Sequence, residues 1–397
     1  MTLFILLYLC GIIEGLLKMN KTEINKISRT RNIAIDLLRI LAMLMIVIWH
    51  SSNHGGLDKL STTLNGYNLY IHYLQALTAV SVNVYVLISG YFLCTQNFRP
   101  SRILKLAIEV WVYSYGILLF CSLTHIVDLN LGDILKSVLP ISYRLNWFVT
   151  SYIGLCIVAP FLNKFINALS QKQHLVLIGV LLATTSVYHD ILPMSFAMDV
   201  YDGKRLSWFI VLYIVASYIR KYVDTKKPMR IKPFAVYLMT TALLFFVWIA
   251  IYWGSQYIGI SDDIKDYGCK YYYSYSSIFV FMSAVSLFLT FLHIDISSEK
   301  IARIVMCIAP LTLGVYLIHD NYILRPAIWN MLDLNPEITI PQFVLNSCVP
   351  IVVFCGCLLI DFIRQSVFKY IYSTSFSKSF MDRFDTDVIN IYNKIKL

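Results

Sequence analysis

The chain has 397 residues, of which 58% are hydrophobic and only 14% are charged. Soluble proteins carry roughly 25% charged residues, so the composition excludes an ordinary water-soluble domain. The apolar residues also occur in blocks of about 20 residues, the length of helix that crosses roughly 30 Å of hydrocarbon. We therefore predict an all-α polytopic membrane protein with about ten transmembrane helices in one bundle.

Ten apolar segments, taken in chain order, are the candidates for these helices. Helices are expected because a span must satisfy its own backbone hydrogen bonds inside the bilayer. Residues 1–32 are expected to form an N-terminal cytoplasmic or membrane-surface segment, with translation starting at Met1 or Met19. Residues 33–365 then form the transmembrane domain and 366–397 a cytoplasmic tail. The ten segments are 33–51, 70–93, 103–124, 147–163, 173–189, 206–220, 233–254, 276–293, 303–320 and 343–363.

Lysine and arginine predict the orientation, because the cytoplasmic loops of membrane proteins are enriched in them. With the N-terminus in the cytoplasm, 24 of the 33 basic residues fall in cytoplasmic segments, 8 in outer loops and one, Arg39, inside a span. This bias predicts a multi-pass protein of the plasma (inner) membrane with both termini in the cytoplasm. The net charge of +10 follows from the same asymmetry, so nucleic acid is not expected as a partner. The nine cysteines show neither a disulfide framework nor a zinc spacing, and no metal site is expected.

The first predicted helix contains two ionisable residues, Arg39 and His50, in the stretch RILAMLMIVIWH. They are 11 positions apart, which places them roughly 16 Å apart and within about 20° of one helix face. Asp36 lies three residues before Arg39, where the two side chains can pair. Ionisable residues inside a membrane usually mark functional sites. A structural alternative stays open, in which Asp36 and Arg39 form an ion pair that serves only the fold and His50 is an interfacial histidine.

Further polar residues are predicted on the outer side of the bundle with His50. His319 ends the ninth segment, in TLGVYLIHDN, and Asn146 and Trp147 begin the fourth. Each residue alone is typical of a helix cap or of the aromatic belt at the membrane surface. Their predicted convergence on one level is more informative than any one of them.

Basic residues are predicted on the inner side with Arg39. Arg99 and Arg102 lie in NFRPSRILK, which follows the second segment. Positive-inside topology is sufficient to explain them, but arginine also binds phosphate through its fork of N–H groups. A docking site for a phosphate-rich ligand is therefore the sharper hypothesis. Gly90, in LISGYFL at the end of the second segment, is expected to allow close helix packing.

Several segments, in order and at family-like separations, resemble the acyltransferase-3 family of integral membrane acyltransferases. An arginine, ten residues and a histidine mark the first span of that family, and Arg39 and His50 match them within IDLLRILAMLMIVIWHS. LISGYFL, FRPSRILKL and NWFVTSYIGLCIVAPFLN are similar to its later segments, and LTLGVYLIHDNYILRP resembles its YLIH segment. The likeness spans roughly residues 30–365 and is closest to short members that acetylate bacterial surface polysaccharides. The chain departs from the family at Lys105, where an arginine is common, and it shows no fused soluble domain.

The resemblance implies transfer of an acyl group from cytoplasmic acyl-CoA, with acetyl-CoA as the default, to a hydroxyl of an extracytoplasmic glycan. The polyanionic CoA is expected near Arg39, Arg99 and Arg102, with Asp36 paired to the first of them. Acyl-CoA is a co-substrate here, and no bound cofactor is expected. The other expected partners are the lipid bilayer and the glycan, either a polysaccharide or its lipid-linked precursor.

The resemblance also implies a role for His50 as a general base that takes the proton of the attacking hydroxyl. Histidine suits this role because its ordinary pKa is about 6.5. A covalent acyl-His50 intermediate is an open alternative. Trp147 and Tyr316 are candidates for stacking on the sugar or the pantetheine arm, and His319 is the second candidate base.

A hypothesis of another class is a transporter or flippase for a lipid-linked glycan. Arg39 and His50 would then be substrate-binding or proton-coupling groups inside the bundle. The two hypotheses differ in chemistry, because only an acyltransferase forms an ester in detergent, where no gradient exists. A glycan polymerase is disfavoured because the outer loops are all short.

Overall fold

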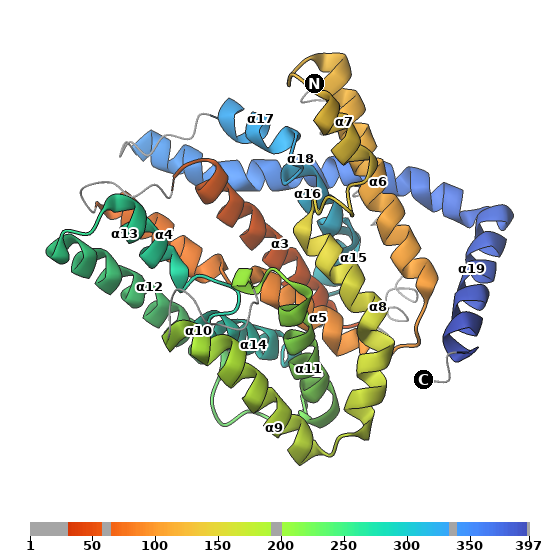
Figure 1. Cartoon of the computed structure of the whole chain (residues 1–397), viewed down its shortest axis with the longest axis horizontal. Helices are drawn as coiled ribbons and strands as arrows, with labels where there is room; N and C mark the ends of the chain where they lie inside the picture. The colour runs from red at the N-terminus through yellow and green to blue at the C-terminus, as the bar shows by residue number, and fades with distance from the viewer. Residues whose placement is uncertain (1–30, 58–64, 192–200, 333–339, 395–397) are drawn as a thin grey trace.

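The computed structural model describes residues 31–57, 65–191, 201–332 and 340–394. The expected N-terminal surface segment and its start at Met1 or Met19 lie outside these residues, except for Arg31 and Asn32. The described residues form helices joined by short loops, with no strand among them (Figure 1). The predicted all-α membrane architecture is therefore confirmed.

Five helices make up the interior of the bundle. Helix α3 (Ile33–His54) begins at Asn32, whose side chain accepts a hydrogen bond from the backbone N–H of Ile35, a standard N-cap. Helix α5 packs so closely on α11 that a β-carbon at Gly90 would lie 2.9 Å from that of Ala216. Gly90 therefore allows close helix packing, as its sequence context predicts. The other interior helices, with their bounds, are α5 (Ser81–Leu93), α11 (Leu206–Tyr222), α14 (Ile278–Leu292) and α16 (Thr312–His319).

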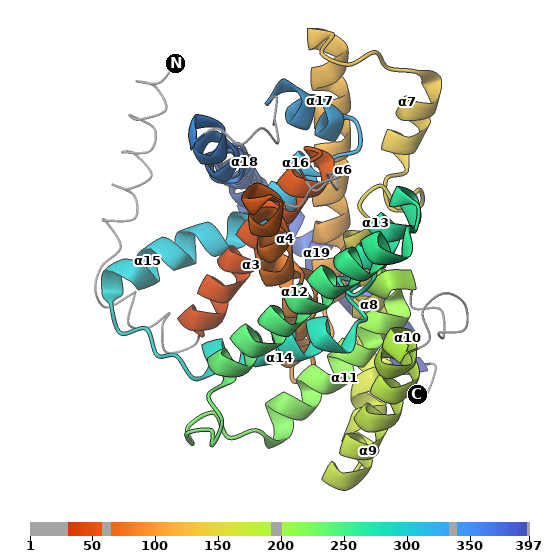
Figure 2. The same cartoon turned by 90° about the vertical axis from the view of Figure 1, so that its left-hand side faces the viewer.

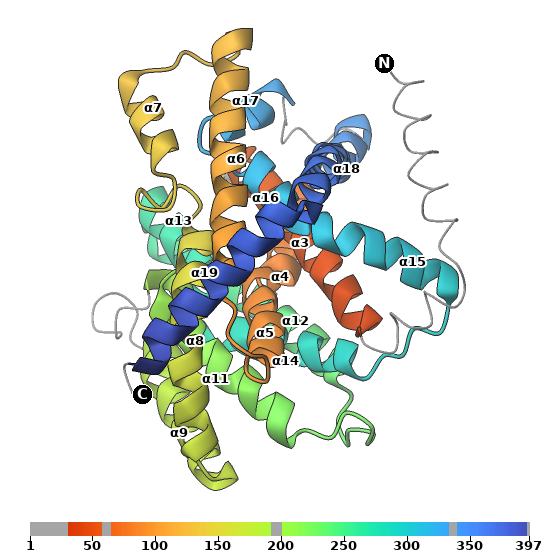
Figure 3. The ribbon, with the colours of Figure 1, turned by 90° about the vertical axis from the view of Figure 1, so that its right-hand side faces the viewer.

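Among the described residues, seven further apolar helices pack around this interior (Figures 2 and 3). Their outward faces carry large exposed hydrophobic side chains, as expected of surfaces that meet lipid. They are α4 (Gly66–Thr78), α6 (Pro100–Thr124), α8 (Trp147–Ala168), α9 (Gln171–Leu182), α12 (Pro233–Ile258), α15 (Glu299–Ile308) and α18 (Ile340–Ser373). Shorter connecting helices are α7 (Leu131–Val138), α10 (Tyr188–Ile191), α13 (Asp262–Tyr271) and α17 (Leu324–Met331).

All ten predicted segments coincide with helices, but only eight helical stretches in the described residues are long and apolar enough to cross a membrane. The other two segments form α11, with 17 residues, and α14, with 15. At about 1.5 Å per residue, both are shorter than the roughly 30 Å of hydrocarbon. Both are packed inside the bundle, where 10 residues of α11 and 8 of α14 are buried. They therefore contact mainly protein, and the lipid thickness does not dictate their length.

The C-terminal segment forms two helices. Helix α18 continues to Ser373, beyond the expected domain boundary at residue 365, and is followed by α19 (Ser375–Lys394). Helix α19 packs on α6, where the Asp385 carboxylate accepts hydrogen bonds of 2.6 and 2.8 Å from the backbone N–H and hydroxyl of Ser101. A carboxylate is favourable at this position because the first turn of a helix carries partial positive charge.

Helix α16 contacts α18 through Gly314. The Asp361 carboxyl group on α18 is completely buried and accepts hydrogen bonds from Tyr113, from Arg364 at 2.6 Å and from Gln365 at 3.1 Å. A β-carbon at position 314 would overlap this carboxyl group. Only glycine therefore lets the two helices approach this closely while the buried charge keeps its partners.

We predict that Gly314→Ala destabilises the protein, because Asp361 cannot move without breaking its hydrogen bonds. Overpacking of this kind costs typically 1–3 kcal/mol, which should appear as a lower Tm of the purified protein in detergent. The matched control is Gly179→Ala in α9, where a β-carbon has open space within 4 Å. Alanine is the better helix former, so this control should not lower the Tm. Equal Tm values for the two variants would contradict the proposed packing.

Candidate active site

Two histidines from distant parts of the chain meet where α3 and α16 end. The Nδ1 atom of His50 lies 2.9 Å from the Nε2 atom of His319. His319 has no exposed surface, and its Nδ1 atom lies 2.6 Å from the backbone carbonyl oxygen of Val315, one turn earlier on α16. Both ring nitrogens of His319 are therefore occupied, and the contact between the two histidines is almost entirely buried.

These contacts determine where the protons lie on both neutral rings. A backbone carbonyl only accepts hydrogen bonds, so Nδ1 of His319 must carry the proton that points at Val315. Nε2 of a neutral His319 is then an acceptor, and His50 must donate to it from its own Nδ1–H. The remaining nitrogen of His50, Nε2, keeps its lone pair. His50 is therefore held in the form that can accept a proton, and His319 orients it.

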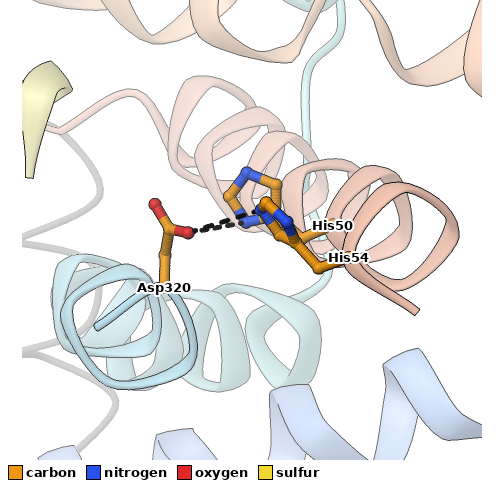
Figure 4. Close-up of side chains that lie close together, drawn as sticks. All are labelled: His50, His54 and Asp320. Atoms are coloured by element: carbon orange, nitrogen blue, oxygen red, sulfur yellow. Dashed lines mark ion pairs between the residues drawn. The ribbon is translucent and has the colours of Figure 1, made fainter. Parts of the chain in front are cut away.

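Asp320 adds a negative charge beside the histidines (Figure 4). Its Oδ1 atom lies 3.7 Å from Nδ1 of His50, 3.8 Å from Nε2 of His54 and 3.1 Å from Nη1 of Arg325. Three of these residues were not predicted from the sequence: Asp320, His54 and Arg325. Signals for two of them were present: Asp320 follows His319 directly in LIHDN, and His54 lies four residues after His50, one turn along the same face.

His50 and His54 line a cavity of about 440 Å³, which we call the outer cavity. It is lined by residues from segments far apart in the chain, including His50, Trp147, Lys204, Tyr275 and Arg325. All five come from parts of the chain that the charge pattern predicts on one side of the membrane. His319 is not among the lining residues, because it is buried behind His50.

A narrow pocket of about 30 Å³ leads from His50 toward the middle of the bundle. Its walls include Tyr85, Phe148, Leu313 and Tyr316. Trp147 lies where this pocket meets the outer cavity and stacks on Tyr275, with ring centroids 5.8 Å apart. Trp147 and Tyr316, both predicted from the sequence, therefore lie beside His50.

Tyr275 also lines both the narrow pocket and the outer cavity. Burial, followed by the negative charges of Asp320 and Asp202, raises the pKa of the Tyr275 hydroxyl above its usual value. The hydroxyl therefore stays protonated at neutral pH and is available as a hydrogen-bond donor.

At the other end of α3, Arg39 lines a second cavity of about 430 Å³, the inner cavity, together with Arg102 and Lys105. Nη1 of Arg39 lies 3.0 Å from Oδ1 of Asp36, as the sequence spacing predicts. The second oxygen of Asp36 pairs with Nε of Arg31. Asp36 thus keeps a cationic partner without Arg39, so the ion pair does not account for the presence of arginine at position 39.

Arg99 and Arg102, the two arginines that follow α5, differ in the cavities that they line. Arg102 lines the inner cavity and also a side cavity of about 200 Å³, where it donates to Gln96. Arg99 lines only the side cavity. The inner end of the bundle therefore has two neighbouring cavities with several shared lining residues, among them Arg102.

Comparison with known protein families identifies the class of enzyme. The sequence model of the family described as an acyltransferase domain (Acyl_transf_3) matches residues 32–362. The chain belongs to the acyltransferase-3 family. It is therefore a membrane acyltransferase, which supports the first hypothesis from the sequence over a transporter. No curated protein and no solved structure matches this acyltransferase-3 member.

Proposed function

We propose that the protein transfers an acyl group from acyl-CoA in the inner cavity to a glycan hydroxyl in the outer cavity, with His50 as the general base. This proposal rests mainly on the chain of contacts from Val315 through His319 to His50, which leaves a lone pair on Nε2 of His50. His50 lines both the narrow pocket and the outer cavity. A base at this junction can reach a hydroxyl from one side and a thioester from the other.

The inner cavity has the chemistry that a CoA phosphate group requires. Arg39, Arg102 and Lys105 line it, and Glu109 is the acidic residue beside them. Nη2 of Arg364 lies 2.7 Å from Oε1 of Glu109, which offsets that negative charge. Arginine forks and lysine both bind phosphate well. The charge pattern favours the inner cavity as the cytoplasmic one, with both termini in the cytoplasm of a plasma (inner) membrane.

The proposed step needs no other reactant. Nε2 of His50 accepts the proton of the acceptor hydroxyl as its oxygen attacks the thioester carbonyl carbon. The new C–O bond forms, the C–S bond breaks, and the CoA thiolate takes the proton from His50. Asp320, near His50 at 3.7 Å, stabilises the positive charge that the imidazole carries between the two proton transfers.

The size of the narrow pocket favours a small acyl group. Its volume of about 30 Å³ is only about two to three times the roughly 10–15 Å³ that holds one water molecule on the same kind of measure. Acetyl is therefore the acyl group that we propose. In the outer cavity, Trp49, Trp147 and Tyr275 provide aromatic faces, which suit a sugar ring of a polysaccharide or a lipid-linked glycan.

We predict that His50→Gln lowers the rate of acyl transfer at least 10²-fold, because an amide forms hydrogen bonds but does not take a proton at neutral pH. His319→Gln should keep part of the activity, since its amide oxygen can still accept the Nδ1 proton of His50. His319→Leu, which cannot, should lose more. The measurement is ester formation from labelled acetyl-CoA and a glycan in detergent.

His125→Gln is the control for these variants, because His125 is an exposed residue that follows α6. It should transfer acetyl at the wild-type rate. The opposite ranking, with His50→Gln active and His319→Gln inactive, would make His319 the base. Labelled enzyme that accumulates without acceptor, and that is absent in His50→Gln, would instead support the covalent alternative.

Substitutions of the two arginines should affect donor binding rather than chemistry. Arg102→Ala removes a cation shared by two cavities, so the KM for acetyl-CoA should rise about 10-fold, as expected for one charge-assisted hydrogen bond. Arg99→Ala should raise it less, because Arg99 lines only the side cavity. The kcat should change little in both variants, since remote phosphate contacts act equally on ground and transition states.

Lys300→Ala is the matched control, because Lys300 is an exposed cation at the start of α15. Its kinetic constants should equal those of the wild type. Equal losses of kcat and kcat/KM in Arg102→Ala would contradict the proposed donor-binding role and move this residue to the transition state.

A further inference from the structure

We propose that His50, His54 and Asp320 bind a divalent transition metal ion, with zinc as the best fit, and that the bound ion inhibits acyl transfer. Each of the three side chains offers one ligand atom, and these atoms all lie within 4.8 Å of one another (Figure 4). The sequence gives no zinc spacing, because the carboxylate comes from the end of α16 and only the two histidines share a helix.

The distances suit zinc after a small contraction. Oδ1 of Asp320 lies 3.7 Å from Nδ1 of His50 and 3.8 Å from Nε2 of His54. Zinc binds histidine nitrogen and carboxylate oxygen at about 2.0–2.2 Å, so neighbouring ligands of a tetrahedral ion lie about 3.3 Å apart. Imidazole and carboxylate ligands together suit zinc, copper and nickel rather than magnesium or calcium.

Metal binding changes the hydrogen bond that orients His50. His50 can offer Nδ1 to a metal only if its proton moves to Nε2, which ends the donation to Nε2 of His319, 2.9 Å away. The two histidines and the carboxylate supply three ligands, and a water molecule would complete a tetrahedral set.

Inhibition follows from the same proton shift, and this part rests on the proposed function. With the metal on Nδ1, the proton of His50 lies on Nε2, and the lone pair that takes the proton of the hydroxyl is lost. A cation beside His50 also disfavours a second positive charge on the ring. The metal therefore blocks the base without occupying the narrow pocket.

Arg325 opposes metal binding. Its Nη1 atom lies 3.1 Å from Oδ1 of Asp320, so its charge repels a cation and its N–H group competes for the ligand oxygen. The site should therefore bind zinc more tightly when this arginine is replaced by a neutral residue. Arg325→Gln is a variant whose expected effect is a gain, which loss of folding cannot imitate.

The test is isothermal titration calorimetry, in which zinc chloride is added to the purified full-length protein in detergent with no acyl donor present. The wild type should bind one zinc ion. His54→Ala and Asp320→Asn should each weaken binding at least 10-fold, while Arg325→Gln strengthens it. His125→Gln, which lacks an exposed imidazole elsewhere, should match the wild type. Cobalt(II) should show the intense visible absorption of tetrahedral coordination in the wild type and lose it in His54→Ala.

Unchanged zinc affinity in both His54→Ala and Asp320→Asn would overturn the metal site, as would weaker binding in Arg325→Gln. The inhibitory role is measured separately, as the ratio of transfer rates with and without zinc in each variant. This ratio should be far below one in the wild type and close to one in His54→Ala, whatever the zinc-free rate of that variant. Normal zinc binding in a protein that transfers no acetyl group would leave the metal site standing and contradict the proposed function.

Discussion

The buried carbonyl oxygen of Val315 is the constraint on which the rest of the site depends. It accepts the Nδ1 proton of His319, so His319 must accept the Nδ1 proton of His50. In water, the two tautomers of a neutral imidazole interconvert freely. In a buried site, the wrong tautomer would leave a polar atom unpaired, at a cost of about 1–3 kcal/mol. The fold therefore keeps the Nε2 lone pair of His50 free of its neighbour His319 before any substrate binds, as the proposed role of His50 requires.

The fold brings these groups together between predominantly apolar helices. Arg39 and His50 lie on one helix, so the length of α3 fixes the separation of the inner and outer cavities. Helix α16 must hold Val315 and His319 against α3 without sliding, and the contact of Gly314 with the buried Asp361 secures it to α18. The small residues of this bundle allow close helix contacts, and these contacts keep its charged and polar groups paired.

The sequence predicted the helices and the positions of Arg39 and His50 along the first of them well, because both depend on local patterns. Apolar blocks mark helices, and the spacing of Asp36, Arg39 and His50 on one helix gives their relative positions directly. The short lengths of α11 and α14 were not predictable, since burial within the bundle, rather than hydropathy, sets them. The contacts of Asp320 and Arg325 with His50 and His54 were missed for a related reason. They join α3 to the end of α16, and no local spacing encodes such a contact.

The position of the proton on His50 tests the proposed role of this residue most directly. Protein labelled with ¹⁵N in its histidine rings, compared with His50→Gln to assign the signal, reports by NMR which ring nitrogen carries the proton. At a pH where His50 is neutral, we expect a protonated Nδ1 and an unprotonated Nε2, and His319→Leu should abolish this preference. A proton found on Nε2 of His50 in the wild type would contradict the general-base role, because that form has no lone pair available to a hydroxyl.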